Sequence, residues 1–234
     1  MNLIPSVFLK ACAEQDLGLS DATLTQMNAY VERLLEVNQH MNLTAVREPE
    51  GIWMRHIFDS LLLLPELKAD PGQRALDLGS GGGFPGIPLA IARPDMQWTL
   101  VDSVQKKVRF LQEVAAELNL QNVQAHSERA EVLAHLPAHR EQYHLVTARA
   151  VARLPVLLEY TIPFLRVNGY FAAMKGAQAA KELKESRRAI ERLSVKLMRR
   201  QEQPGGGQLL WFKKRRPTMD KYPRAVGIPS QKPI

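Results

Sequence analysis

Apolar positions in the first 70 residues recur at helical spacing. Residues 4–17 form a short amphipathic pattern. A second pattern begins after Ser20 or Asp21, and either side chain can cap a helix. A third apolar stripe covers residues 51–67. We therefore predict an N-terminal helical extension over residues 1–70, packed on the main part of the chain.

From residue 71 onward, short apolar runs alternate with helical patterns. The runs typical of buried strands are residues 74–79, 96–103, 122–128, 143–149 and 169–176. This alternation predicts an α/β fold with a doubly wound, mostly parallel sheet, in which right-handed crossovers place strands on both sides of the first one. Residues 177–200 favour either one long charged helix or a helix that grades into a strand. Residues 71–234 are thus expected to form the main domain, ending in a basic helix or hairpin and a tail.

A glycine-rich loop follows the first predicted strand, in the segment DLGSGGGFPGIPLA of residues 77–90. In a doubly wound sheet, ligands bind beyond the carboxyl ends of the strands, next to the first strand. Glycine permits a positive φ in a tight turn, and it lets a ligand approach the backbone without meeting a Cβ. The loop therefore predicts a nucleotide or nucleoside site.

Three nucleotide motifs compete for this loop. A phosphate-binding P-loop requires GxxxxGK[ST], and the absence of any lysine between the loop and Lys106 excludes it. The GxGxxG pattern of dinucleotide folds fits Gly81, Gly83 and Gly86 only loosely. The third pattern is acidic–x–Gly–x–Gly–x–Gly, starting at Asp77, and it resembles the first motif of the S-adenosylmethionine-dependent methyltransferase fold. That ligand carries no phosphate, so it needs no lysine.

Polar residues after the next two strands support a nucleoside ligand. Asp102 ends the second predicted strand, and a carboxylate there can accept both ribose hydroxyls of NAD or of S-adenosylmethionine. It can also cap the following helix. In methyltransferases of this fold the loop after the third strand usually lies along the adenine, which points here to Ala130 and Glu131. An exposed helix carboxylate is the alternative for Glu131.

Cysteine content and hydropathy limit where the protein is expected to reside in the cell and which sites it can contain. The single cysteine, Cys12, excludes an intrachain disulfide framework and a cysteine-rich zinc site. The N-terminus lacks the basic start and long apolar stretch of a signal peptide, and no run approaches the roughly 18 apolar residues of a membrane helix. We expect a cytoplasmic protein with no membrane contact and no metal.

Positive charge is concentrated at the C-terminal end. Residues 175–234 carry 16 Lys and Arg against 5 Asp and Glu, whereas the whole chain has a net charge of +7. Such asymmetry is typical of a polyanion-binding surface, although a solvated basic helix and tail would give the same count. The expected phosphate contacts are Arg199, Arg200, Lys213, Lys214, Arg215 and Arg216. Trp211, Phe212 and Tyr222 could stack on unpaired bases, but Trp211 and Phe212 are more typical of a strand.

The acceptor atom decides which residues a methyltransferase needs. Methylation at C5 of a pyrimidine requires a cysteine nucleophile, and Cys12 lies far in sequence from the predicted sheet. Methylation of an exocyclic amine usually comes with an Asn/Asp-Pro-Pro-aromatic turn after the fourth strand, where this chain has Arg149. Ribose O-methylation needs a base or a lysine-centred set, and Lys175 has no evident partners. Guanine N7 has a lone pair and needs no base, so positioning would suffice. These patterns leave the base and the atom open.

Several segments of the chain, taken together, resemble one particular protein family. They are NLTAVREPEGIWMRHIFDSLLLL, ALDLGSGGGFPGIPLAIARPD, TLVDSVQKKVRFLQEV, VTARAVARLPVLLEY and MKG. From about Tyr30 to the C-terminus the chain resembles the ribosomal RNA small-subunit methyltransferase G family, also called glucose-inhibited division protein B. The resemblance implies a Rossmann-like class I fold, S-adenosylmethionine as donor, and N7 methylation of one guanine in the decoding-region loop of 16S rRNA. It also implies the small subunit or its RNA as partner, and we expect a monomer.

The resemblance also implies the positions of the cofactor ligands. Carried over residue by residue, they fall on Gly79, Phe84, Asp102, Ala130, Glu131 and Arg149. Arg149 could assist catalysis by holding a phosphate or carbonyl oxygen, or it could pin the cofactor loop. Gly82 departs from the family's commoner loop, which often has Ala or Pro there.

Four polar residues precede the sheet: Asn42, Arg55, His56 and Asp59. Two kinds of metal-ligating side chain are too few for a convincing metal site. A satisfied His–Asp pair that packs the third helix onto the cofactor region is one interpretation. The other is a lid over the methyl donor. Beside methyl transfer, two other functions remain compatible with the residues, a nicotinamide-dependent oxidoreductase and a non-catalytic RNA-binding assembly factor.

Overall fold

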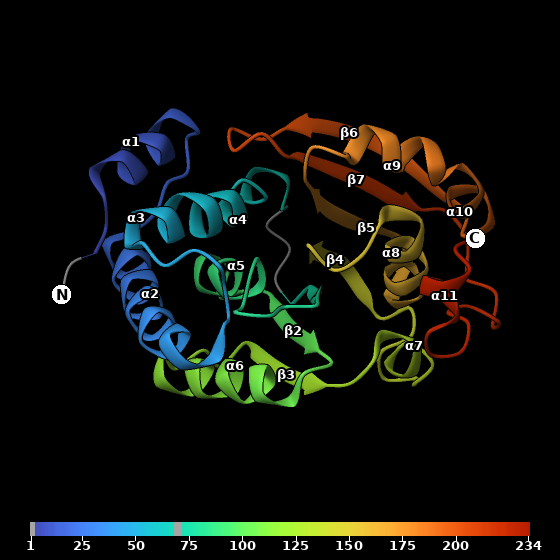
Figure 1. The fold of residues 1–234 in the computed structure, drawn as a ribbon, viewed down its shortest axis with the longest axis horizontal. Coiled ribbons are helices and arrows are strands. Elements are labelled where there is room, and N and C mark those ends of the chain that lie inside the picture. The colour runs from blue at the N-terminus through green and yellow to red at the C-terminus, as the bar shows by residue number, and fades with distance from the viewer. Residues whose placement is uncertain (1–2, 68–71) are drawn as a thin grey trace.

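The computed structural model describes residues 3–67 and 72–234, so the boundary that we place between residues 70 and 71 lies outside the described residues. A seven-stranded sheet with the order β3-β2-β1-β4-β5-β7-β6 forms its centre (Figure 1). The strands are β1 (Arg74–Leu78), β2 (Gln97–Asp102), β3 (Val123–Ser127), β4 (Tyr143–Arg149), β5 (Leu165–Lys175), β6 (Val195–Glu202) and β7 (Gln208–Lys214). Strands β1 to β5 are parallel, and β7 is antiparallel to both β5 and β6. The predicted α/β fold with a mostly parallel sheet is confirmed.

The central strands β1 and β2 are buried almost from end to end. Every residue of β1 after Arg74 and every residue of β2 after Gln97 is buried. Continuous burial is typical of parallel strands, because helices cover both faces of the sheet. Polar chemistry is therefore confined to the loops at the ends of these strands.

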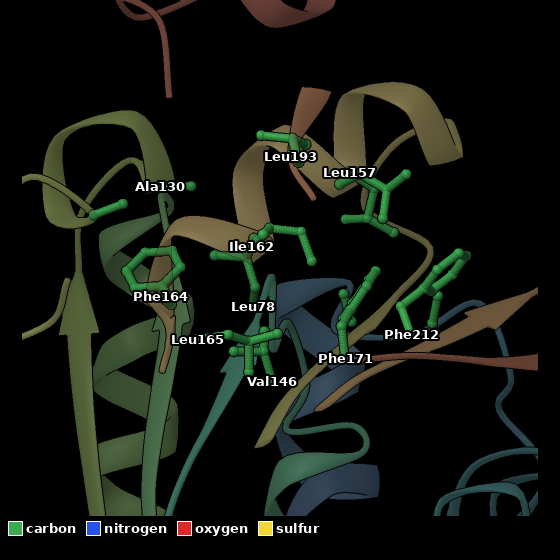
Figure 2. Packing of buried hydrophobic residues seen from close by; sticks show 14 of the residues in the cluster. Leu78, Ala130, Val146, Leu157, Ile162, Phe164, Leu165, Phe171, Leu193 and Phe212 are labelled. Atoms are coloured by element: carbon green, nitrogen blue, oxygen red, sulfur yellow. The ribbon is translucent and has the colours of Figure 1, made fainter. Parts of the chain in front are cut away.

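One face of the sheet packs against the helices of the C-terminal half. They are α7 (Ala130–Leu133), α8 (Leu154–Thr161), α9 (Ala179–Glu185) and α10 (Arg187–Arg192), followed by the short α11 (Ile228–Gln231). Figure 2 shows Val146 and Phe171 of the sheet beneath Leu157 and Ile162, which belong to one continuous cluster of buried side chains. This layer fixes the loops that follow β3 and β4.

Residues 177–200 fold as the second of the two predicted alternatives. Helices α9 and α10 are separated at Ser186, and β6 begins at Val195 shortly after α10 ends. Helix α8 ends at Thr161, and a single 3-10 turn over Ile162–Phe164, which contains Pro163, leads into β5.

The other face of the sheet packs against α5 (Gly86–Ala92) and α6 (Gln105–Glu117), and the N-terminal helices lie outside this layer. Helix α2 (Asp21–Met41) contacts α5, and α1 (Ser6–Glu14) places Phe8 against Trp53. Ser20 caps α2 by accepting a hydrogen bond from the Thr23 amide at 3.2 Å, as its position predicts. Phe8, Leu34 and Trp53 share one buried cluster with Ile87 of α5 and Phe110 of α6. The N-terminal helices therefore share their core with the helices that flank the glycine loop.

The third predicted helix is not a single helix. It is divided into α3 (Pro49–Ile52), a π-helix η1 (Trp53–Phe58), α4 (Asp59–Leu61) and a 3-10 turn η2 (Leu64–Glu66). The wider π turn lets Trp53, Ile57 and Phe58 all enter the core. Short π segments often mark functional sites, and this one holds Arg55 and His56.

Candidate active site

The glycine loop leaves β1 with a backbone that requires glycine at three positions. Gly79, Gly81 and Gly83 have φ angles of 72°, 57° and 107°. A Cβ on Gly83 would lie 2.7 Å from Ile87 Cγ1 and 2.8 Å from the Tyr30 hydroxyl oxygen. The loop is thus both left-handed and tightly packed on its inner side.

Asp77, the acidic residue of the motif, anchors this loop from inside the sheet. Its carboxylate accepts hydrogen bonds from the Gly86 amide at 3.2 Å and from Thr147 Oγ1 at 2.9 Å. Because the side chain is fully buried, desolvation raises its pKa to about 6 in spite of these hydrogen bonds. The Asp77 side chain thus connects the start of α5 to β4 by hydrogen bonds, which fixes the two ends of the loop relative to the sheet.

Asp102 ties the glycine loop to the end of β2. Its Oδ2 accepts from the Gly81 amide at 3.0 Å, and its Oδ1 accepts from the Val104 amide at 2.9 Å. The side chain is buried but borders a pocket, and each carboxylate oxygen has a further lone pair. Ribose binding by Asp102 remains a prediction, and its geometry leaves room for that role.

A pocket of about 450 Å³ opens above the carboxyl ends of β1, β2 and β3, within the size range of small-molecule sites. Four of the predicted cofactor residues line it: Gly79, Asp102, Ala130 and Glu131. Glu131 is 5% exposed, so the alternative of an exposed helix carboxylate is wrong. Val151, in the loop after β4, lies so close to Gly79 that a Cβ there would approach it to 2.4 Å. This loop forms the pocket's opposite wall.

Phe84 and Arg149, the other two predicted cofactor residues, do not line this pocket but meet in a second cluster. The His56 ring lies between them, with its centroid 4.5 Å from that of Phe84 and its Nδ1 2.8 Å from Arg149 Nη2. Burial lowers the pKa of Arg149, whereas the charges of Asp59 and Asp77 raise it. The π-helix thus brings a side chain of the N-terminal region against the end of β4.

His56 is held as a neutral ring. Burial, together with the charge of Arg149, lowers its pKa to about 4. Its Nδ1 contacts both Arg149 Nη2 and, at 2.9 Å, the Arg55 carbonyl, and one nitrogen cannot accept from the first while donating to the second. Because the guanidinium always donates, we assign Nδ1 as an acceptor and Nε2–H as the donor to Thr44 Oγ1 at 2.6 Å. Both ring nitrogens are therefore engaged, and the side-chain contacts of His56 are to Arg149 and Thr44, whereas one of the two interpretations of the sequence was a His56–Asp59 pair.

One nitrogen of the Arg149 guanidinium has no hydrogen-bond partner among the described residues. Its Nη1 is buried and makes no hydrogen bond within the described part of the chain. A buried guanidinium N–H without an acceptor is costly, which makes it available to a ligand oxygen. Asp59 is close enough to Arg149 to feel its charge. Burial raises the pKa of the Asp59 carboxyl, and the positive charge of Arg149 lowers it.

Asn42 and Arg55 have other surroundings. Asn42 ends α2 in the left-handed conformation, and its side chain accepts from Arg47 at 3.3 Å. Arg55 is exposed on η1. Asn42 thus has an evident role as a helix C-cap, and a lid role for these residues stays a prediction.

The structure adds residues that the sequence patterns did not single out. The Tyr30 hydroxyl donates to the Gly82 carbonyl at 2.5 Å, so α2 supports the glycine loop directly. A Cβ on Gly205 would lie 3.6 Å from Asp59 Oδ1, which places the loop between β6 and β7 beside Asp59. Tyr30 was visible only as one member of an apolar stripe, and no local signal marks Gly205.

One of the basic residues near the C-terminus stabilises the fold and is not available to bind phosphate. Lys214 was expected to contact phosphate, but it is fully buried. Its ammonium donates to Glu141 at 2.6 Å and to the carbonyls of Ile162 and Leu165, and burial lowers its pKa to about 8. The prediction is wrong because alternation along β7 turns Lys214 to the same buried face as Phe212.

The other predicted phosphate ligands differ in availability. Arg200, Arg215 and Arg216 are exposed. Arg199 is exposed but pairs with Glu66, and Lys213 lies over the Tyr170 ring. The aromatic rings of Trp211, Phe212 and Tyr222 are buried, which excludes base stacking on them.

Residues 3–67 and 72–234 contain no helix long and apolar enough to cross a membrane. Within the same ranges, no three His, Cys, Asp or Glu side chains converge in a way that could hold a metal ion.

Comparison with known proteins gives consistent matches. A family model described as GidB, rRNA small subunit methyltransferase G, matches residues 23–206. The protein named Ribosomal RNA small subunit methyltransferase G from Desulfitobacterium hafniense (strain Y51) is 42% identical over 224 residues, which cover 94% of this chain and 92% of that protein. The protein of the same name from Desulforamulus reducens is 40% identical over 239 residues and covers both chains completely.

Solved structures resemble the fold at lower identity. The ribosomal protein L11 methylase from Lactobacillus delbrueckii subsp. bulgaricus has a TM-score of 0.52 at 16% identity, covering 67% of this chain and 77% of that one. The O-methyltransferase from Bacillus cereus in complex with SAH has a TM-score of 0.55 at 15% identity, covering 80% and 91%. At these identities the structures establish the fold alone, which is the Rossmann-like class I methyltransferase fold.

Proposed function

The chain belongs to the rRNA small subunit methyltransferase G family, and we propose that it transfers the methyl group of S-adenosylmethionine to N7 of a guanine in 16S rRNA. The observation that carries the proposal is the match to relatives of that name over the full length of the chain at 40% identity. The finer statements, the guanine, its N7 atom and the RNA partner, are our inference. The site geometry supports them as follows.

The pocket residues fit S-adenosylmethionine. Gly79 lines the pocket and has no side chain, so a ligand can approach its backbone closely, and Asp102 offers its free lone pairs to ribose hydroxyls. Ala130 and Glu131 border the part of the pocket where adenine would lie. When bound, the donor supplies an activated methyl group on sulfur. The protein's own task is to hold that group in line with the acceptor atom.

The second cluster suits an acceptor that needs no general base. His56 has a pKa of about 4 and both of its ring nitrogens are engaged, so it is a poor proton acceptor for catalysis. Guanine N7 carries a lone pair and no proton. The unpartnered Arg149 Nη1 can donate to the neighbouring O6 of guanine, which leaves N7 free to attack. We propose this as the positioning role of Arg149.

The partner is proposed to be 16S rRNA or the small ribosomal subunit. Arg200, Arg215 and Arg216 are exposed and can neutralise phosphates, which gives affinity with little choice of sequence. A monomeric, cytoplasmic enzyme is part of the same proposal.

A methyl-transfer assay tests the proposal. The purified protein is incubated with radiolabelled S-adenosylmethionine and either naked 16S rRNA or small subunits from cells that lack the protein, and the labelled nucleotide is mapped. We expect one labelled guanine whose N7 methylation makes the chain cleavable by aniline after reduction. Label on another base or atom would refute the N7 assignment. The absence of label on any RNA or particle, with donor binding intact, would favour the assembly-factor alternative.

A further inference from the structure

The last segment of the chain, residues 217–234, reaches the pocket that we assign to the methyl donor. Ser230 of α11 is one of the residues that line this pocket, on the same side as Ala130 and Glu131. Tyr160 of α8 lines it as well, and Ser230 Oγ donates to the Gly227 carbonyl at 2.9 Å. In Figure 1, α11 lies beside α8 and above α7, far in sequence from the glycine loop.

The first part of this tail is anchored by two residues that follow α7. The Arg140 guanidinium donates to the carbonyls of Thr218 and Tyr222, at 3.0 and 2.9 Å. The His135 ring contacts the Pro223 carbonyl at 2.8 Å. Because these contacts hold backbone atoms, they fix the path of the tail independently of most of its side chains.

The second part is anchored on α8 and α7. Arg224 forms an ion pair with the fully buried Glu159 at 2.7 Å and donates to the Lys232 carbonyl at the same distance. Glu131 Oε1 accepts from the Gly227 amide at 3.1 Å. Glu131 is therefore a pocket residue and a tail anchor at once, which connects the position of the tail to the shape of the pocket.

We infer that residues 225–234 form a wall of the donor pocket, and that Ser230 and the Glu131–Gly227 hydrogen bond set the affinity for the adenosyl part of the donor. The inference rests on the proposed function for the identity of the ligand. The tail lies outside residues 23–206, which the family model covers, so that match does not imply a role for it. The tail acts by positioning: it borders the bound nucleoside and takes no part in methyl transfer.

The test compares substitutions at two adjacent exposed residues of α11. Ser230→Trp puts a bulky ring at the pocket, whereas the matched control Gln231→Trp puts it on a neighbouring residue that does not line the pocket. The measurement is the Kd for S-adenosylhomocysteine by calorimetry, with the Tm of each variant. We expect Ser230→Trp to weaken binding at least tenfold and Gln231→Trp to stay within twofold, with both Tm values within about 2 °C of the wild type. Steady-state kinetics should show a raised donor KM with little change in kcat.

A deletion of residues 225–234 provides a second variant if Ser230→Trp lowers the Tm. It removes Gly227 and Ser230 but keeps Tyr222 and Arg224, which hold the preceding segment. We expect at least a fivefold weaker Kd. A wild-type Kd in Ser230→Trp or in the deletion variant would overturn the inference. If the wild type binds S-adenosylhomocysteine but labels no RNA, the proposed substrate fails and the inference stands. If the wild type does not bind it, both fail.

Discussion

Replacing Gly83 by alanine tests whether the glycine loop is fixed by backbone geometry and packing. The φ of 107° is one that L side chains rarely adopt, and strain at such a position costs about 1–3 kcal/mol. The new Cβ would also lie 2.7 Å from Ile87 Cγ1 and 2.8 Å from the Tyr30 hydroxyl oxygen, and both residues are fully buried. Overpacking of this kind adds roughly 1–3 kcal/mol. We therefore expect Gly83→Ala to lower the free energy of unfolding by about 2–6 kcal/mol.

The neighbouring Gly82 provides the matched control. Its φ is not positive, and a Cβ there would lie 3.3 Å from Leu34 Cδ1 and 3.4 Å from both Leu43 Cβ and the Leu43 carbonyl oxygen. A small shift of the Leu34 side chain relieves the first contact, and the other two are at ordinary van der Waals distance. Because alanine also restricts the unfolded chain, Gly82→Ala should change stability by less than about 1 kcal/mol. Urea denaturation followed by linear extrapolation measures both variants. Equal stability of Gly83→Ala and Gly82→Ala would refute the reasoning.

Three further predictions concern charged groups. Since His56 has a folded-state pKa of about 4 against 6.5 for a free side chain, folding favours its neutral form, and the stability it supports is lost as pH falls below 6.5. Urea titrations should show the advantage of wild type over His56→Gln shrinking by about 2 kcal/mol from pH 8 to pH 5; a pH-independent difference would contradict this. The raised pKa of Asp77 makes stability fall as pH rises, which is opposite to the effect of His56. Because Asp77 is present in both the wild type and His56→Gln, its effect cancels in the difference between them. Lys214→Met removes the buried ammonium from Glu141 and from two carbonyls, although Glu141 keeps the hydrogen bond from the Thr218 amide, and we expect it to destabilise the fold by about 3–5 kcal/mol. The RNA affinity of the folded fraction should be unchanged, and a loss of affinity at full stability would restore Lys214 as a phosphate ligand. Replacing Arg200, Arg215 and Arg216 by alanine should leave the Tm unchanged and reduce the slope of log Kd against log salt by about 2–3 in filter-binding assays; an unchanged slope would place the RNA on another surface.

Local sequence patterns were sufficient to predict those features that lie within a single strand or loop. The apolar run before Asp77 and the spacing of Gly79, Gly81 and Gly83 predict β1 and the loop after it, because a buried strand and a left-handed turn each restrict residue type. The order of strands and helices also placed Asp102 and Glu131 at the correct edge of the sheet, since parallel strands end on one side.

Contacts between distant segments could not be predicted in the same way. The His56–Arg149 contact joins residues 93 apart, and nothing near His56 indicates a π turn. Lys214 is buried because it lies on the same face of β7 as Phe212 and Leu210, two and four residues before it. The prediction relied on the positive charge of Lys214 and did not use this alternation. Glu141, its partner, lies before β4 and becomes evident only once the sheet order is known.

The core that α1 and α2 share with α5 and α6 has a consequence for synthesis. Phe8 packs on Trp53 within the N-terminal segment, but the buried cluster to which both belong also includes side chains between Phe84 and Leu120. None of those side chains exists when the first 70 residues have been made. Until then these helices present apolar surface without a partner, and such surface attracts other chains. The N-terminal segment therefore depends on chaperones or on continued elongation, and a fragment that ends near residue 67 is expected to aggregate when it is expressed alone.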